Sequence, residues 1–256
     1  MNPITFHEND LPVKDLETIG LASGGQLLLN VDDLKALLSG RRTSLLELHD
    51  LETDNIKIKS INAKISLKLN ESGKLDLLIN PIYRKTDIPD FLNETEAQQL
   101  RKGEVANLLK ITLDNHGNKK EMLVEYDPET KEFIVSDTDK ILAPDMVNNE
   151  FLTPAQKEAY RKGKEVQIAD GTKLNYSATD HHGIRSNKLR LVASILIDGG
   201  LSYMVYKGLN AMFNQKRDQK SAEKLSPGYH QALKDIENQR GFKPHEFEQS
   251  RSRKGR

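Results

Sequence analysis

The 256-residue sequence has no cysteine and no tryptophan, and only 5% of its residues are aromatic. Without cysteine there are no disulfides, no thiolate metal sites and no thiol nucleophile. With so few aromatic rings the chain offers little surface on which single-stranded bases can stack. We therefore expect neither a zinc finger nor a thiol enzyme, and the sequence predicts no catalytic residue and no cofactor.

The sequence also lacks an excess of charge of either sign. Thirty-eight Lys and Arg residues balance thirty-eight Asp and Glu residues, which argues against a protein that binds nucleic acid over its whole surface. The N-terminal residues contain no basic stretch followed by an apolar one, so no secretory signal is predicted. We expect a cytoplasmic protein.

The first predicted unit, residues 10–84, combines short helices with antiparallel strands. Asn30 is a typical N-cap for a helix over residues 31–38. Apolar and polar residues alternate over 61–69, which predicts a strand with one buried face, and the sequence ESGK at 71–74 predicts a hairpin turn. This pattern is typical of an α+β module.

Two later segments resemble each other. Residues 91–103 read FLNETEAQQLRKG and residues 151–163 read FLTPAQKEAYRKG. Each predicts a capped helix that ends at a glycine, followed by strand, turn and strand. In the first copy, Leu109, Ile111 and Leu113 are expected on the buried face of the strand. We predict one helix-and-hairpin module used twice, over residues 91–136 and 151–180.

Pairs of basic residues follow three predicted helices. They are Arg41 and Arg42, Arg101 and Lys102, and Arg161 and Lys162. Such pairs are candidates for contact with nucleic acid or another anion. Cations at a helix C-terminus are also explained by the helix dipole alone, and we favour that interpretation.

The most apolar part of the chain, residues 186–213, predicts a helix. A charged residue at its centre, at a cost of roughly 2.5 to 3.5 kcal/mol in a bilayer, argues against a membrane span. Small residues near the centre favour close contact with a partner helix or a second copy. The candidate interaction residues are Leu191, Ile195, Asp198, Gly199, Gly200, Ser202 and Tyr206. Residues 214–256 are expected to form a charged tail with one short helix, disordered at its end.

The segment Asp180-His181-His182 is a candidate metal site on residue type alone. Adjacent histidines point to opposite faces of a strand, and the spacing typical of a helical zinc site is absent. We therefore expect a solvated turn.

Part of the chain resembles a bacterial domain of unknown function, and a later part resembles a second domain often found beside it. The first resemblance rests on Leu11-Pro12, Leu16, Ile19-Gly20, Leu34, Leu37-Leu38, Gly40-Arg41, Thr43 and the hairpin from Ala63 to Ile82. The second rests on Leu152-Thr153, Gln156, Arg161, Gly163-Lys164 and Asp170-Gly171-Thr172. Together they cover most of residues 10–180. The resemblance implies an accessory role in conjugative or other mobile elements of anaerobic gut bacteria, and it implies no catalytic residue.

These observations lead to three functional hypotheses. The first is a non-enzymatic accessory protein that acts through contacts with protein partners or with itself. The second is a nucleic-acid-binding factor that uses the basic pairs. The third is a component attached to a membrane through residues 189–213.

Overall fold

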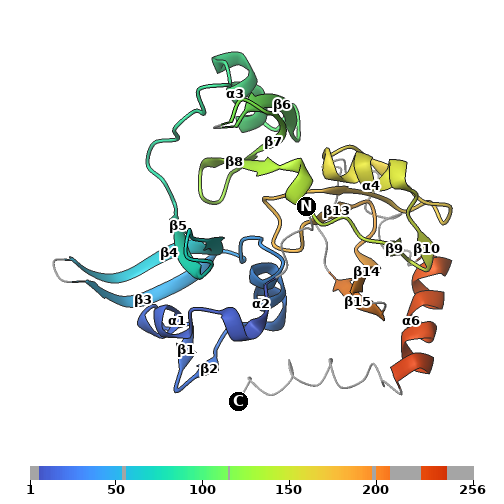
Figure 1. Cartoon of the computed structure of the whole chain (residues 1–256), viewed down its shortest axis with the longest axis horizontal. Helices are drawn as coiled ribbons and strands as arrows, with labels where there is room; N and C mark the ends of the chain where they lie inside the picture. The colour runs from blue at the N-terminus through green and yellow to red at the C-terminus, as the bar shows by residue number, and fades with distance from the viewer. Residues whose placement is uncertain (1–5, 54–55, 115, 198–199, 208–225, 241–256) are drawn as a thin grey trace. The chain divides into compact units, whose positions relative to one another are not determined.

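The chain folds into two compact units built from short helices and small sheets (Figure 1). The computed structural model describes residues 6–53, 56–114, 116–197, 200–207 and 226–240. The first unit comprises the residues up to Leu142 together with Arg161–Lys164 and Asn175–Arg185, and the second comprises the remaining segments from Ala143 onward. The strand pairs whose register is defined are antiparallel. The predicted α+β class is therefore confirmed.

The first unit begins with two helices packed on a three-stranded sheet. Its elements up to residue 81 are η1 (Glu8–Asp10), α1 (Val13–Thr18), β1 (Ala22–Ser23), β2 (Gln26–Leu27), α2 (Val31–Leu38), β3 (Leu46–Thr53), β4 (Ile56–Leu69) and β5 (Leu75–Pro81). Leu16 of α1, Leu37 of α2 and Ile65 of β4 are completely buried in one apolar cluster. The Asn30 side chain accepts a hydrogen bond from the Asp33 N–H at 2.8 Å, as the predicted N-cap requires.

A second sheet of the first unit packs on one helix. Its elements are α3 (Glu94–Arg101), β6 (Leu108–Leu113), β7 (Lys119–Asp127), β8 (Glu132–Asp137) and the short η2 (Thr138–Lys140). Asn93 and Glu96 form the predicted capping box, in which each side chain accepts from the other residue's N–H. Leu100 of α3 packs with Val124 and Phe133 of the sheet.

Strand β6 buries the opposite face from the one predicted. Leu108 packs in the cluster under α3, and Lys110 on the same face forms an ion pair with Glu96. Leu109, Ile111 and Leu113 therefore point away from α3 and are exposed. Alternation along a strand defines two faces, but only the packing of α3 decides which one is covered.

The second unit contains a four-stranded sheet and the helices α4 and α6. Its elements are β9 (Met146–Val147), β10 (Glu150–Phe151), α4 (Pro154–Arg161, in this unit up to Tyr160), β11 (Val166–Gln167), β14 (Arg190–Ile197), β15 (Gly200–Lys207) and α6 (Pro227–Arg240). The sheet has the order β10-β9-β14-β15, and Val192 of β14 packs against Tyr229 and Ile236 of α6. The strands β12 (Lys173–Tyr176) and β13 (Ile184–Ser186) each run from one unit into the other.

The predicted apolar helix over residues 186–213 is wrong. β14 and β15 pair there as antiparallel strands, with a register that runs from Arg190↔Lys207 to Ile197↔Gly200. A short apolar run is compatible with a buried strand as well as with a buried helix. The β-branched residues in this run favour the strand. Of the candidate interaction residues, Asp198 and Gly199 lie outside the described residues, and the strands carry Leu191, Ile195, Gly200, Ser202 and Tyr206.

The repeat of a complete module is not confirmed. Thr153 and Gln156 cap α4 much as Asn93 and Glu96 cap α3. Beyond the helices the two segments differ, because β6 and β7 pair along the whole of β6, whereas β11 pairs with β12 only at Val166↔Leu174 and Gln167↔Lys173. The likeness of the two segments therefore covers the helices, which end at Arg101 and Arg161 and are each followed by a glycine of positive φ, Gly103 or Gly163.

The short helix expected in the C-terminal tail is confirmed as α6. The expected disorder after it falls on residues 241–256, which lie outside the described residues. In the part of the chain that the structure describes, no helix has both the length and the apolar character that a membrane crossing requires.

Candidate functional site

Charged side chains gather inside the first unit around the segment Asn175–Arg185. Glu125 lies on β7, on the face of the sheet opposite α3, and is 1% exposed. Its carboxylate accepts hydrogen bonds from the Ser177 hydroxyl at 2.8 Å and from the Ala178 N–H at 2.5 Å. The guanidinium of Arg185 lies 3.9 Å away. The segment is thus anchored to the sheet by a buried carboxylate.

Burial dominates the electrostatics of this carboxylate. It raises the pKa of Glu125 above the ordinary value of a glutamate, against the opposing charge of Arg185 and the two hydrogen bonds. Burial also raises the pKa of the Tyr176 hydroxyl to about 12, and the nearby charge of Glu125 adds to this shift. Both groups favour their neutral forms more than free side chains do.

A buried ion pair lies beside this carboxylate. Lys64 of β4 is 2% exposed, and its Nζ lies 2.7 Å from Asp127 Oδ2 and 2.8 Å from Glu129 Oε2. The same ammonium group donates to the Thr179 carbonyl at 3.1 Å. A buried lysine needs such partners, because an uncompensated charge in the interior is strongly destabilising.

A tight turn over residues 180–183 presents two histidines. The Gly183 N–H donates to the Asp180 carbonyl at 2.8 Å and closes the turn. Gly183 has a φ of +72°, and a Cβ at this position would lie 2.6 Å from Cδ of Arg41, so a glycine is required here. Arg41 supports the turn from outside, since its Nε donates to the His181 carbonyl at 3.1 Å.

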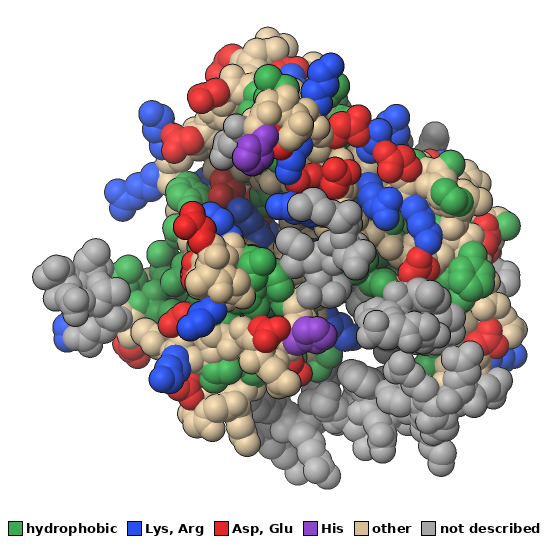
Figure 2. All heavy atoms as spheres, in the orientation of Figure 1, with side chains coloured by type: hydrophobic (Ala, Val, Ile, Leu, Met, Phe, Trp, Pro, Cys, Tyr) green, Lys and Arg blue, Asp and Glu red, His purple; other side chains and the backbone are tan. Residues whose placement is uncertain are grey.

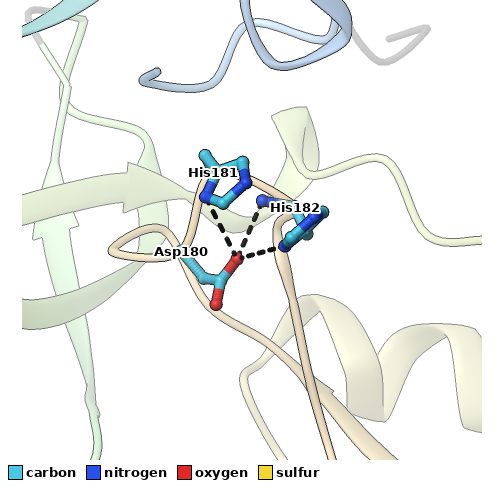
Figure 3. Close-up of side chains that lie close together, drawn as sticks. All are labelled: Asp180, His181 and His182. Carbon is cyan, nitrogen blue, oxygen red and sulfur yellow. Dashed lines mark hydrogen bonds and ion pairs between the residues drawn. The ribbon is translucent and has the colours of Figure 1, made fainter. Parts of the chain in front are cut away.

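Both imidazole rings turn their Nδ1 atoms toward one carboxylate oxygen (Figure 3). Asp180 Oδ1 lies 3.1 Å from Nδ1 of His182 and 3.9 Å from Nδ1 of His181. The same oxygen accepts from the His182 N–H at 2.8 Å, and the ring centroids are 3.9 Å apart. These three side chains are therefore the described residues that can hold a metal ion, with ligand atoms within 4.8 Å of one another.

The expectation of a turn at this segment is confirmed, but the expectation that it is solvated is wrong. The Asp180 side chain is 2% exposed and that of His182 is 10% exposed. Burial opposes ionisation of Asp180, yet the hydrogen bonds and charge of His182 lower its pKa below the ordinary value. Burial and the charge of His182 lower the pKa of His181.

The proximity of these three side chains was not predicted from the sequence, because the rule that adjacent histidines point to opposite faces holds for strands. In a turn, consecutive side chains can point to the same side, so the strand rule does not apply. The sequence Asp-His-His-Gly itself indicates the turn. Its aspartate can accept a hydrogen bond from the backbone N–H two residues later, and its glycine is typical of the end of a turn.

The basic pairs do not converge on one surface. Arg101 lies over the ring of Phe133, 5.4 Å from its centroid, on the face of the sheet that α3 covers. Lys162 pairs with Glu121 at 2.7 Å, and Glu121 points to the opposite face because it alternates with Val124 and Tyr126 along β7. Arg101 and Lys162 thus contact different faces of the same sheet.

The remaining predicted cations also have partners. Arg42 pairs with Glu132, Lys102 lies 3.8 Å from Glu104, and Arg161 donates to the Ile141 carbonyl at 3.3 Å. On the face that Figure 2 shows, Lys and Arg side chains are interspersed with Asp and Glu. Contact of these cations with nucleic acid stays a prediction.

Comparison with known proteins adds one similarity. Residues 6–91 match the model of a family described as protein of unknown function (DUF4099). This stretch contains Arg41 and Lys64, whereas Glu125 and the turn at residues 180–183 lie beyond it. A search of curated proteins and a search of solved structures each found no match. The similarity of residues 152–172 to a second domain stays a prediction.

Proposed function

We propose that the chain is a non-enzymatic, cytoplasmic accessory protein of a mobile element, which acts through protein–protein contacts and associates with a second copy of itself through β6. The resemblance in the sequence supports the mobile-element setting. The observation that carries the contact is the apolar row of Leu109, Ile111 and Leu113, which we call the β6 row. Ile111 and Leu113 are 65% and 68% exposed.

The β6 row lies on an edge strand. β6 is the terminal strand in the order β6-β7-β8, so among the described residues no strand pairs with its outer edge. An edge strand offers unpaired N–H and C=O groups, and an exposed apolar row on it favours the addition of another strand. On this face β6 itself carries no charged side chain of the kind that usually protects such an edge, and the charges of Glu121 and Lys119 lie on the neighbouring strand β7, opposite Ile111 and Leu113.

The sequence of β6 suits pairing with its own copy. In an antiparallel pair centred on Ile111, Leu109 of one copy faces Leu113 of the other, and the β6 row becomes continuous across both chains. Lys110 then faces Thr112 of the other copy. A pair centred on Lys110 would instead place two ammonium groups opposite each other, which is destabilising. The arrangement centred on Ile111 is therefore the one that we propose.

We expect the wild-type protein to form a dimer and the Ile111→Lys variant to be monomeric at the same concentration. Removing two isoleucines from the interface, each worth roughly 1.5 to 3 kcal/mol when buried, weakens the dimer by at least about 100-fold. Sedimentation velocity over a range of protein concentrations measures this change.

The matched control is Leu28→Lys. Leu28 is 61% exposed and lies between β2 and α2, far along the chain from β6, so this variant should dimerise like the wild type. A wild-type protein that sediments as a monomer at every concentration contradicts self-association through β6. Equal weakening by both variants would show that the contact lies elsewhere.

No observation on the described residues favours the alternative of nucleic-acid binding. Arg42, Lys102 and Lys162 each lie beside a glutamate, so a phosphate would have to displace an existing partner. This alternative remains a prediction of the sequence.

A further inference from the structure

We propose that Asp180, His181 and His182 form a binding site for a divalent transition metal, with Zn²⁺ as the ion that best suits these ligands. This site lies outside the residues that carry the proposed self-association. It would be formed by consecutive residues of one turn, so its geometry depends on local structure.

The distances from Asp180 to the two histidines are close to those between neighbouring ligands of a zinc ion. In a tetrahedral site with Zn–N and Zn–O bonds of about 2.0 to 2.2 Å, neighbouring ligand atoms are separated by roughly 3.3 to 3.5 Å. Asp180 Oδ1 lies 3.1 Å from Nδ1 of His182 and 3.9 Å from Nδ1 of His181. These two distances lie on either side of the required value, and all three ligand atoms lie within 4.8 Å of one another.

The ligand types select the class of metal. One carboxylate and two imidazoles suit Zn²⁺ and its neighbours in the first transition row, whereas Ca²⁺ and Mg²⁺ prefer six or more oxygen ligands. Three protein ligands leave a fourth position for water or another small ligand. The His181 side chain is 29% exposed, which gives solvent a route to that position.

The surrounding residues hold the ligands in place before any ion binds. The Asp180 carboxylate is 2% exposed and oriented by the His182 N–H. The guanidinium of Arg41 is held on the His181 carbonyl, and Gly183 allows it to lie against the turn. Because these contacts already order the turn, ion binding requires little loss of conformational freedom.

Zinc binding to the full chain, freed of metal by chelation, tests the proposal. We expect isothermal titration with ZnCl₂ to show one tight site per chain. His182→Ala should weaken this site at least about 100-fold, since losing a ligand costs more than the 10- to 100-fold typical of losing an outer hydrogen-bond partner. Added Co²⁺ should give the visible absorption bands of a tetrahedral site in the wild type and not in this variant.

Two further variants keep the test decisive. His116→Ala removes an exposed histidine from the turn after β6 and should bind Zn²⁺ like the wild type. Asp180→Asn keeps an oxygen that can accept the His182 N–H, so it should preserve the turn while weakening the site, and far-UV circular dichroism checks its folding. Absence of zinc binding to the wild type overturns the proposal. Equal binding by the wild type, Asp180→Asn and His182→Ala does so as well.

Discussion

The surroundings of Glu125 disfavour the ionised form of its carboxyl group. It is buried between β7 and the segment Asn175–Arg185, where two hydrogen-bond donors hold it. The free energy that these donors and Arg185 contribute does not fully offset the loss of hydration, and the pKa of Glu125 is raised. Its neutral form is therefore favoured in the folded protein over the unfolded chain.

We predict that Glu125 makes the protein less stable as the pH rises. Because the folded-state pKa of Glu125 lies above the ordinary 4.5, its stabilising contribution is complete below that value and is lost as the pH rises through the raised pKa. The free energy of unfolding of the wild type should therefore fall with pH relative to that of Glu125→Gln. Urea titrations followed by circular dichroism at several pH values measure this difference.

The exposed Glu104 provides the control for this experiment. Glu104 lies beside Lys102 at the surface. The Glu104→Gln variant should show the same change of unfolding free energy with pH as the wild type. Parallel curves for the wild type and Glu125→Gln would show that the folded protein does not resist ionisation of Glu125.

At the level of elements, the starts of α3 and α4 depend on local sequence. Asn93 with Glu96, and Thr153 with Gln156, are separated by three residues and meet within the first helical turn. Such contacts involve residues of a single helical turn. The exposed face of β6 is different, because it depends on the side of the sheet on which the separate element α3 packs.

Replacing Asn93 by alanine should destabilise the protein by about 1 kcal/mol, the usual cost of removing an N-cap side chain. Asn93→Asp keeps an oxygen that accepts the Glu96 N–H and should change the stability by less. Thermal or urea unfolding followed by circular dichroism gives both values. A loss as large in Asn93→Asp as in Asn93→Ala would show that the cap hydrogen bond is not the cause.

At the level of the whole molecule, the region similar to the family of unknown function is not complete in itself. Lys64 lies within residues 6–91, but its ionic and hydrogen-bonding partners Asp127, Glu129 and Thr179 all lie later in the chain. On β4, Ile65 faces the helices α1 and α2, and Lys64 faces the other side of the sheet. The later segments therefore complete the interior on that side.

Lys64→Met should destabilise the full chain by about 3 to 5 kcal/mol, because Asp127 is left as a buried charge without its partner. The double variant Lys64→Met/Asp127→Asn should lose less free energy of unfolding than the two single variants lose in sum. Urea unfolding of the four proteins measures the coupling between the two residues.

Lys68→Met is the matched control, since Lys68 lies on the same strand but is exposed. Its effect should stay within about 0.5 kcal/mol, as for most surface substitutions. Similar losses for Lys64→Met and Lys68→Met would contradict a stabilising role for the buried ion pair.

Features that depend on near neighbours follow from the residue types alone. The cap at Asn30, the capping box at Asn93, the hairpin between β4 and β5 and the turn at residue 180 all follow from residue types a few positions apart. Each of these features is stabilised by contacts within one turn or one hairpin, so the pattern carries the necessary information.

Which surfaces are buried and which distant side chains meet depends on how the elements pack together. The β6 row was expected inside and lies outside, because α3 packs on the other face. β14 pairs with β9, which lies far earlier in the chain, as in Ala193↔Val147. Glu125 joins Ser177, and Lys64 joins Asp127, across long stretches of chain. Such contacts depend on how separate elements pack, and no local pattern of residues specifies that packing.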